Sequence, residues 1–171
     1  MTNQPENRVA DIISAAGGRL VSRVRLQKVA YLLDKVGAKS GFRFSYHHYG
    51  PYSRDLDNAI LDAEAFAQVK ENFEYRHSDG ARYSVFQLSG EAAHKFSYLK
   101  ERRLREWAKE LADINVTVLE LAATAHWLRE EEHVPDWKDE IVRRKGPKTR
   151  HGRLEEAVRL LAKLGLQPAS L

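Results

Sequence analysis

Apolar residues recur every three or four positions along much of the chain, which is the spacing of an amphipathic helix. In the first two thirds of the chain, this spacing predicts helices over about residues 6–16, 22–36 and 53–67. It also predicts a long helix from Ser89-Gly90-Glu91 to about Asp113. Between the second and third of them, the stretch Phe42–Tyr49 alternates and is rich in aromatic residues, so it predicts a short strand.

A β-hairpin is predicted directly after the third helix. Val69–Arg76 alternates in polarity, Asp79-Gly80 is typical of a tight turn, and Tyr83–Leu88 provides the returning strand. Three helices followed by a hairpin form the layout of a winged helix, with the hairpin as the wing.

The last third of the chain predicts three more helices. The first begins at a capping box, Thr117-Val118-Leu119-Glu120, and is apolar nearly all round, so we expect it to be central. A short helix follows from Pro135 to Gly146-Pro147, and Thr149 is expected to cap the last one. We therefore predict a mainly α protein with a small β-hairpin. A winged-helix-like domain spans residues 1–114, and a three-helix, helix-turn-helix-like unit of residues 115–171 packs on it.

The composition narrows the class of protein. The chain has 171 residues, of which 43% are hydrophobic and 30% charged, as in ordinary globular proteins. It contains no cysteine, which excludes disulfides, thiolate metal sites and a cysteine nucleophile. Because neither an export signal nor a long apolar run is evident, we expect a cytoplasmic protein without a membrane segment.

Motifs for catalysis or metal binding are scarce. His47 and His48 are adjacent on a predicted strand, so they point to opposite faces and cannot bind one ion together. His126 lies on an apolar helix and is typical of a core histidine. No serine elbow and no glycine-rich phosphate loop occur, and Glu130-Glu131-Glu132 is typical of a solvated cluster. We predict no enzyme activity, no metal and no cofactor, although an unrecognised site stays open.

The net charge of +4 permits binding to nucleic acid without requiring it. Residues 143–153 carry six Lys or Arg and no acid, next to a predicted helix start that would offer backbone N–H groups to a phosphate. The candidate DNA-binding residues are Arg143, Arg144, Lys145, Lys148, Arg150, His151 and Arg153. A solvated, solubilising loop is an equally good interpretation of this run.

The turn Tyr49-Gly50-Pro51-Tyr52-Ser53 has two interpretations. Glycine, proline and serine together favour a rigid strand-to-helix corner, with Pro51 at the start of the helix. The tyrosines alternatively form an aromatic platform for a partner. Asp55 and Asp57 follow in the first turn of the predicted helix, and carboxylates there suit a protein surface better than DNA.

Two motifs together suggest a family. Leu26-Gln27-Lys28-x-x-Tyr31, followed by Tyr49-Gly50-Pro51, resembles the Panacea domain of SocA-like antitoxins. The chain is even more similar to uncharacterised YwgA-type proteins, in which a Tyr-Gly-Pro-Tyr-Ser turn leads into a helix. The resemblance covers about residues 24–88 and implies that the protein neutralises a partner toxin by direct contact, without catalysis.

The sequence therefore supports two hypotheses. The first is a non-enzymatic, prokaryotic binding protein of antitoxin or defence-associated type, with Gln27, Lys28, Tyr49, Tyr52 and Arg54 at the contact with a protein partner. The second is a winged-helix transcriptional regulator that binds double-stranded DNA through residues 143–153, in an arrangement that allows a homodimer.

Overall fold

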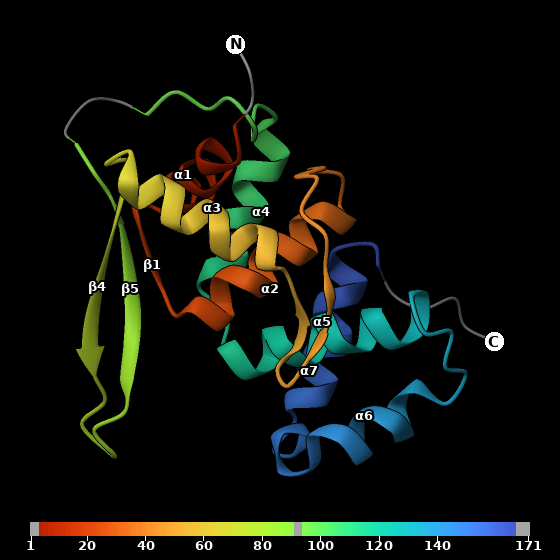
Figure 1. Ribbon diagram of the computed structural model, residues 1–171. Coiled ribbons are helices and arrows are strands. Elements are labelled where there is room, and N and C mark those ends of the chain that lie inside the picture. The colour runs from red at the N-terminus through yellow and green to blue at the C-terminus, as the bar shows by residue number, and fades with distance from the viewer. Residues whose placement is uncertain (1–3, 91–93, 167–171) are drawn as a thin grey trace.

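The computed structural model describes residues 4–90 and 94–166, and this part of the chain is mainly helical, with two small β-sheets (Figure 1). The helices are α1 (Pro5–Ala15), α2 (Arg23–Lys35), α3 (Arg54–Ala65), α4 (Arg102–Ala112), α5 (Val116–Glu130), α6 (Trp137–Lys145), the 3₁₀-helix η1 (Gly146–Thr149) and α7 (Arg153–Lys163). The strands are β1 (Arg19–Val21), β2 (Ser45–His47), β3 (Gly50–Tyr52), β4 (Val69–Tyr75) and β5 (Arg82–Leu88).

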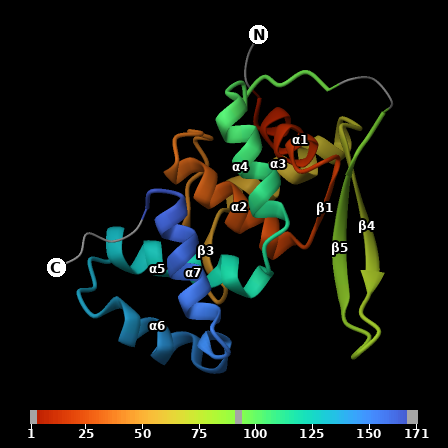
Figure 2. The same ribbon diagram turned by 180° about the vertical axis from the view of Figure 1, so that it is seen from behind.

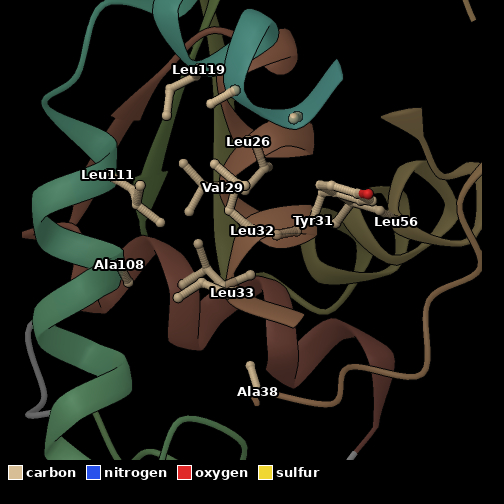
Figure 3. Packing of buried hydrophobic residues seen from close by; sticks show 14 of the residues in the cluster. Leu26, Val29, Tyr31, Leu32, Leu33, Ala38, Leu56, Ala108, Leu111 and Leu119 are labelled. Atoms are coloured by element: carbon tan, nitrogen blue, oxygen red, sulfur yellow. The ribbon is translucent and has the colours of Figure 1, made fainter. Parts of the chain in front are cut away.

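Helices α2 and α5 form the centre of the core. Buried residues occur on every side of α5, which confirms the prediction of a central helix. Leu26 and Val29 of α2 point toward Leu111 of α4 and Leu119 of α5 (Figure 3). Buried side chains from before and after residue 114 belong to one cluster, so the two predicted parts share a core. Within the described residues, no helix is both long and apolar enough to cross a bilayer.

The predicted β4–β5 hairpin is confirmed. Its strands pair antiparallel from Val69 opposite Leu88 to Tyr75 opposite Arg82. The sequence did not predict β1, which pairs with the other side of β5 and gives the strand order β1-β5-β4. A strand of three residues is too short to leave an alternating pattern. The hairpin projects from the helical body, and β4 lies on its outer side (Figures 1 and 2).

The predicted corner at Tyr49–Ser53 is instead a second, small hairpin. Only Ser45–His47 of the predicted strand is extended and paired, and its partner is β3. His47 lies opposite Gly50, so His48 and Tyr49 form the two-residue loop. Pro51 therefore lies in a strand and does not start the helix, because α3 begins after Ser53, whose side chain accepts the N–H of Leu56 at 3.2 Å.

The long helix predicted from residue 89 to 113 begins much later, at Arg102. Its expected start at Glu91 lies outside the described residues, and residues 94–101 are not helical. The buried carboxylate of Asp11 explains the difference, because its Oδ2 accepts the backbone N–H groups of Ser97, Tyr98 and Leu99 at 3.1, 2.6 and 2.9 Å. These bonds take the N–H groups that a continuous helix would need.

Two predicted helix caps are also wrong. Asn115, and not Thr117, caps α5, since its Oδ1 accepts the N–H groups of Thr117 and Val118 at 2.9 and 3.2 Å. Helix α7 begins after Gly152 without a side-chain cap, while the hydroxyl of Thr149 donates to the carbonyl of Gly146 at 2.7 Å. A short polar side chain close to a helix start is therefore not enough to identify the cap.

Candidate functional site: the β2–β3 hairpin and the basic segment

Gln27 and Lys28 of the family-like motif lie on α2 beneath strand β3. The side-chain N–H of Gln27 donates to the carbonyl of Ser53 at 2.9 Å, and its Oε1 accepts the N–H of Ser53 at 2.8 Å. Nζ of Lys28 donates to the carbonyl of Pro51 at 2.6 Å. Gln27 is 4% exposed and Lys28 1%, so these two residues position the hairpin from below and present no surface to a partner.

Gly50 allows the hairpin to approach α5. Its φ of +89° is a conformation that favours glycine, and a Cβ added to it would lie 2.5 Å from Oγ1 of Thr124. Thr124 is buried, and its Oγ1 has no hydrogen-bond partner among the described residues. The glycine is therefore required for its backbone angle and for the close packing of β3 on α5.

Tyr31, the last residue of the first motif, is a core residue. It is fully buried, and its hydroxyl lies 2.8 Å from Nδ1 of His126 on α5. Burial raises the pKa of Tyr31 and lowers the pKa of His126, so both side chains are neutral. The sequence interpretation of His126 as a hydrogen-bonded core histidine agrees with this contact.

A buried charge cluster lies under the same hairpin. The carboxylate of Glu120 on α5 accepts from Nζ of Lys148 at 3.1 Å and lies 3.5 Å from Nζ of Lys145. Lys145 also donates to the carbonyl of His48 at 3.0 Å. The cluster therefore joins α5, α6, η1 and the loop of the β2–β3 hairpin.

Positive charge exceeds negative charge in this cluster. Burial lowers the pKa of Lys28 to about 7, with Glu120 opposing the shift and the neighbouring Lys145 and Lys148 adding to it. Burial lowers the pKa of Lys145 as well. Three lysines thus lie near one carboxylate, Glu120. Burial favours the neutral form of Lys28, the most buried of the three, which reduces the excess of positive charge.

The exposed side of the hairpin, which we call the hairpin face, consists of His47, His48, Tyr49, Tyr52 and Arg54. Tyr49 is 54% exposed, and Nζ of Lys148 lies 4.8 Å from its ring centroid. The ring of Tyr52 lies 4.6 Å from that of His47, and its hydroxyl donates to Asp57, which raises the pKa of Tyr52.

A shallow depression borders the hairpin face. It has a volume of about 470 Å³ and is lined by Tyr46, His47, His48, Arg144 and Lys145. The guanidinium of Arg144 lies 5.0 Å from the ring centroid of Tyr46. The depression is basic and aromatic, but both of its cations already have carboxylate partners in the chain.

The basic segment is largely engaged in contacts within the molecule. Arg143 binds Glu140, and Arg144 binds both Glu140, at 2.7 Å, and Glu132, at 2.9 Å. The guanidinium of Arg153 donates to the carbonyls of Lys148 and Pro147 at 2.7 and 2.8 Å. Together with Lys145 and Lys148 at Glu120, these contacts leave few of the seven candidate residues open to DNA.

Arg143 is exposed but paired with Glu140, and Arg150 and His151 are the other exposed basic residues of the segment. They precede Gly152, the residue before α7, so they lie at the helix start that the sequence proposed for phosphate binding. The first turn of α7 carries Glu155 and Glu156, whose charges oppose an anion there.

No group of three or more His, Cys, Asp or Glu within residues 4–90 and 94–166 could bind a metal ion. The expectations that the chain uses no metal and no cofactor, and that it is not an enzyme, stay predictions.

Two residues important to this site were not identified from the sequence. The sequence places Glu120 in a predicted capping box and does not single out Thr124. Glu120 is the only acid between Val116 and Arg129 on α5, and a lone carboxylate on an otherwise apolar helix indicates a buried ion pair. No comparable signal marks Thr124.

No protein-family model matches the chain, and no curated protein matches it. The resemblance to Panacea domains and YwgA-type proteins thus depends on the motif residues themselves, and it stays a prediction.

Proposed function

We propose that this protein acts by binding another protein, as an antitoxin-like or defence-associated regulator, and that it performs no catalysis. The observation that carries the proposal is the combination of a rigid support and an exposed aromatic surface at the hairpin face. Gln27, Lys28 and Lys145 bind the hairpin backbone from below, while Tyr49 at its loop stays half exposed. A preorganised tyrosine loses little entropy on binding, which is why tyrosine is common at the centres of interfaces.

We also propose that residues 1–114 are a winged-helix-like domain. The order α1, β1, α2, α3, β4, β5 supports this proposal, as does the pairing of β1 with the hairpin. In this arrangement, α3 takes the place of a recognition helix. Its first turn carries Asp55 and Asp57, and the former pairs with Arg43 at 3.2 Å, which favours a protein partner over DNA.

The partner is best sought in the gene next to the one that encodes this chain. We expect the product of that gene to be toxic when expressed alone and to be neutralised by co-expression with this protein. Tyr49→Ala and Arg54→Ala should each abolish the rescue of growth and co-purification with the partner, because both side chains are exposed on the hairpin face. Their thermal midpoints should stay near that of the wild type.

Two further variants complete this experiment. Lys109→Ala, an exposed substitution on α4, should rescue growth normally. Tyr52→Phe keeps the ring against His47 and removes only the hydroxyl bound to Asp57, so it separates ring contact from hydrogen bonding. Normal rescue by both Tyr49→Ala and Arg54→Ala would refute the proposed face, and a harmless neighbouring product that does not co-purify would refute the proposed function.

A DNA-binding regulator is the second candidate, supported by the exposure of Arg150 and His151 at the start of α7. Its test is the salt dependence of binding to a DNA duplex. The double variant Arg150→Ala/Arg153→Ala should reduce the slope of log affinity against log salt by about one and not two, since Arg153 already donates to two carbonyls. Binding that does not weaken with salt would exclude this candidate.

A further inference from the structure

Strand β4 has one unpaired edge. It is the last strand in the order β1-β5-β4, and no strand among the described residues pairs with its other side. Figures 1 and 2 both place this edge on the outside of the molecule, with β5 between it and β1. An unpaired edge is a template for another strand unless charges, prolines or bulges protect it. β4 (VKENFEY) has no proline and pairs with β5 without a bulge, but it carries Lys70, Glu71 and Glu74, so a partner strand must match these charges.

The hydrogen bonds to β5 determine which backbone groups of β4 are free. The carbonyl of Gln68 accepts the N–H of Ser89, and the N–H of Arg76 donates to the carbonyl of Ala81, both at 2.9 Å. In an antiparallel pair the N–H and C=O of one residue point the same way, and this direction alternates along the strand. Even-numbered residues therefore face β5, and the outward groups belong to residues 69, 71, 73 and 75.

We propose that this edge pairs antiparallel with the same edge of a second copy, centred on Asn72, so that two molecules form one six-stranded sheet about a two-fold axis. In this register, Val69 lies opposite Tyr75, and Glu71 lies opposite Phe73, of the other copy. All four outward-facing residues of each strand then exchange hydrogen bonds with the partner strand.

The charges select this register. Centred on Asn72, it places Lys70 opposite Glu74 of the other copy, and symmetry repeats the pair at the far end. Both residues direct their backbone groups toward β5, so each pair occupies a non-hydrogen-bonded site, where facing side chains are closest. Lys70 and Glu74 are both exposed, and the present ion pair of Glu74, with Arg19, is a long 3.7 Å.

The neighbouring registers are disfavoured. Centring on Glu71 would place the two Glu71 carboxylates directly opposite each other. Centring on Phe73 would place Lys70 opposite Arg76 of the other copy. Like charges at facing positions destabilise a strand pair, so each alternative contains a repulsive contact that the register on Asn72 lacks.

The pairing also covers exposed aromatic surface. Phe73 is 47% exposed and Tyr75 63%, on the same side of β4, and the Phe73 rings of the two copies would be diagonal neighbours across the two-fold axis. One strand from each molecule is a small contact compared with a standard interface of roughly 1,600 Å². We therefore expect a reversible dimer in the micromolar range, with association dependent on concentration.

A charge exchange tests the pairing by sedimentation velocity over a range of protein concentrations. Lys70→Glu alone and Glu74→Lys alone should each weaken dimerisation by about tenfold or more, because each creates two like-charge contacts. The double variant K70E/E74K should restore dimerisation to within about threefold of the wild type. A wild-type protein that stays monomeric, or a dimer that K70E leaves unchanged, would overturn the proposal.

Single cysteines test the register, and the chain offers a clean background because it contains none. Asn72→Cys places two thiols opposite each other at the two-fold axis, within reach of a disulfide, so mild oxidation should give a covalent dimer. Glu71→Cys and Phe73→Cys are the matched controls and should cross-link poorly. Preferential cross-linking of a control would refute the register. If the wild-type protein is a monomer and the K70E variant no longer binds the product of the neighbouring gene, the edge of β4 binds that partner, and self-pairing is refuted.

Discussion

The two hairpins of this protein differ in what supports them. The β2–β3 hairpin is short, and α2, α5 and α6 contact its backbone through Gln27, Lys28, Thr124 and Lys145. The β4–β5 hairpin is longer, projects from the body, and exposes Phe73 and Tyr75 near its tip (Figure 1).

This difference separates two kinds of surface. In the first hairpin, the fold fixes the backbone and leaves a few side chains to make contacts. In the second, the backbone of β4 is itself available along one edge, since only β5 pairs with it among the described strands. We therefore expect substitutions of the residues that support the first hairpin to change the free energy of unfolding, and substitutions along the free edge of the second to change association between copies.

The largest contrast is expected between two Gly→Ala substitutions. Gly50→Ala combines positive φ with a clash against Thr124 and should lower the free energy of unfolding by about 3–5 kcal/mol. Gly80→Ala, at the turn of the β4–β5 hairpin, has positive φ but open space around its Cβ, so the loss should be about 1 kcal/mol. Urea denaturation measures both values.

A second substitution identifies the source of the strain at Gly50. Thr124→Ala removes the hydroxyl that the new Cβ would meet, so it should recover part of the stability lost in Gly50→Ala. Equal losses in Gly50→Ala and Gly80→Ala would mean that β3 does not pack on α5 as described.

Gln27→Ala should cause the next largest loss. It removes both hydrogen bonds to the backbone of Ser53 and leaves the buried N–H of Ser53 without its partner, while the carbonyl keeps the N–H of Asp57 at 3.3 Å, so the loss should be about 2 kcal/mol. Gln87→Ala on β5 is the matched control, because Gln87 is exposed and accepts only a long bond of 3.4 Å from Asn72. Its effect in the same denaturation experiment should stay below about 0.5 kcal/mol.

The pKa of Lys28 makes stability depend on pH. Burial lowers this pKa to about 7 in the folded protein, below the value of 10.5 expected without burial. The unfolded chain therefore binds more protons between about pH 7 and pH 10.5, so this lysine makes the free energy of unfolding rise with pH across that window.

Lys28→Met should remove this contribution. Relative to the variant, the wild type should gain at most about 1.4 kcal/mol per pH unit between pH 7.5 and 9.5. Denaturation of both proteins at several pH values measures the difference, in which other titrating groups cancel to first order. Parallel stability curves would show that Lys28 is charged in the folded state throughout this range.

The smallest effect on the folded monomer is expected for Tyr75→Ser. Tyr75 is largely exposed on β4, so its removal should change the free energy of unfolding by less than about 0.5 kcal/mol in dilute protein. A larger loss under these conditions would show that the tip of the hairpin contributes to the core.

Where the sequence succeeded, one face of an element or one local turn carried enough information. The apolar spacing over residues 6–16 predicted α1, and Asp79-Gly80 predicted the turn between β4 and β5. The apolar character of α5 predicted its central place. In each case the signal lies within a single segment of the chain, because helical and alternating periods are local properties.

The failures involve competing contacts that the helical period does not reveal, and the contact is distant in the chain at Asp11 but local at Pro51 and at the two wrong caps. Residues 94–101 continue a helical pattern, yet Asp11 binds their backbone N–H groups from more than 80 positions away in the chain. Pro51 was expected to start a helix, but its pairing with Tyr46 places it in a strand.

The sequence by itself determined the helical periods, the larger hairpin and the presence of two unusual motifs. Only the tertiary structure decided what those motifs do. Gln27 and Lys28 bind the backbone of Ser53 and Pro51, and Gly50 packs against Thr124, and none of these contacts is evident in the sequence. The same holds for the basic segment. Its charges are evident in the sequence, but folding supplies Glu120, Glu132 and Glu140 as partners, and the exposed charge of a segment depends on which carboxylates the fold places beside it.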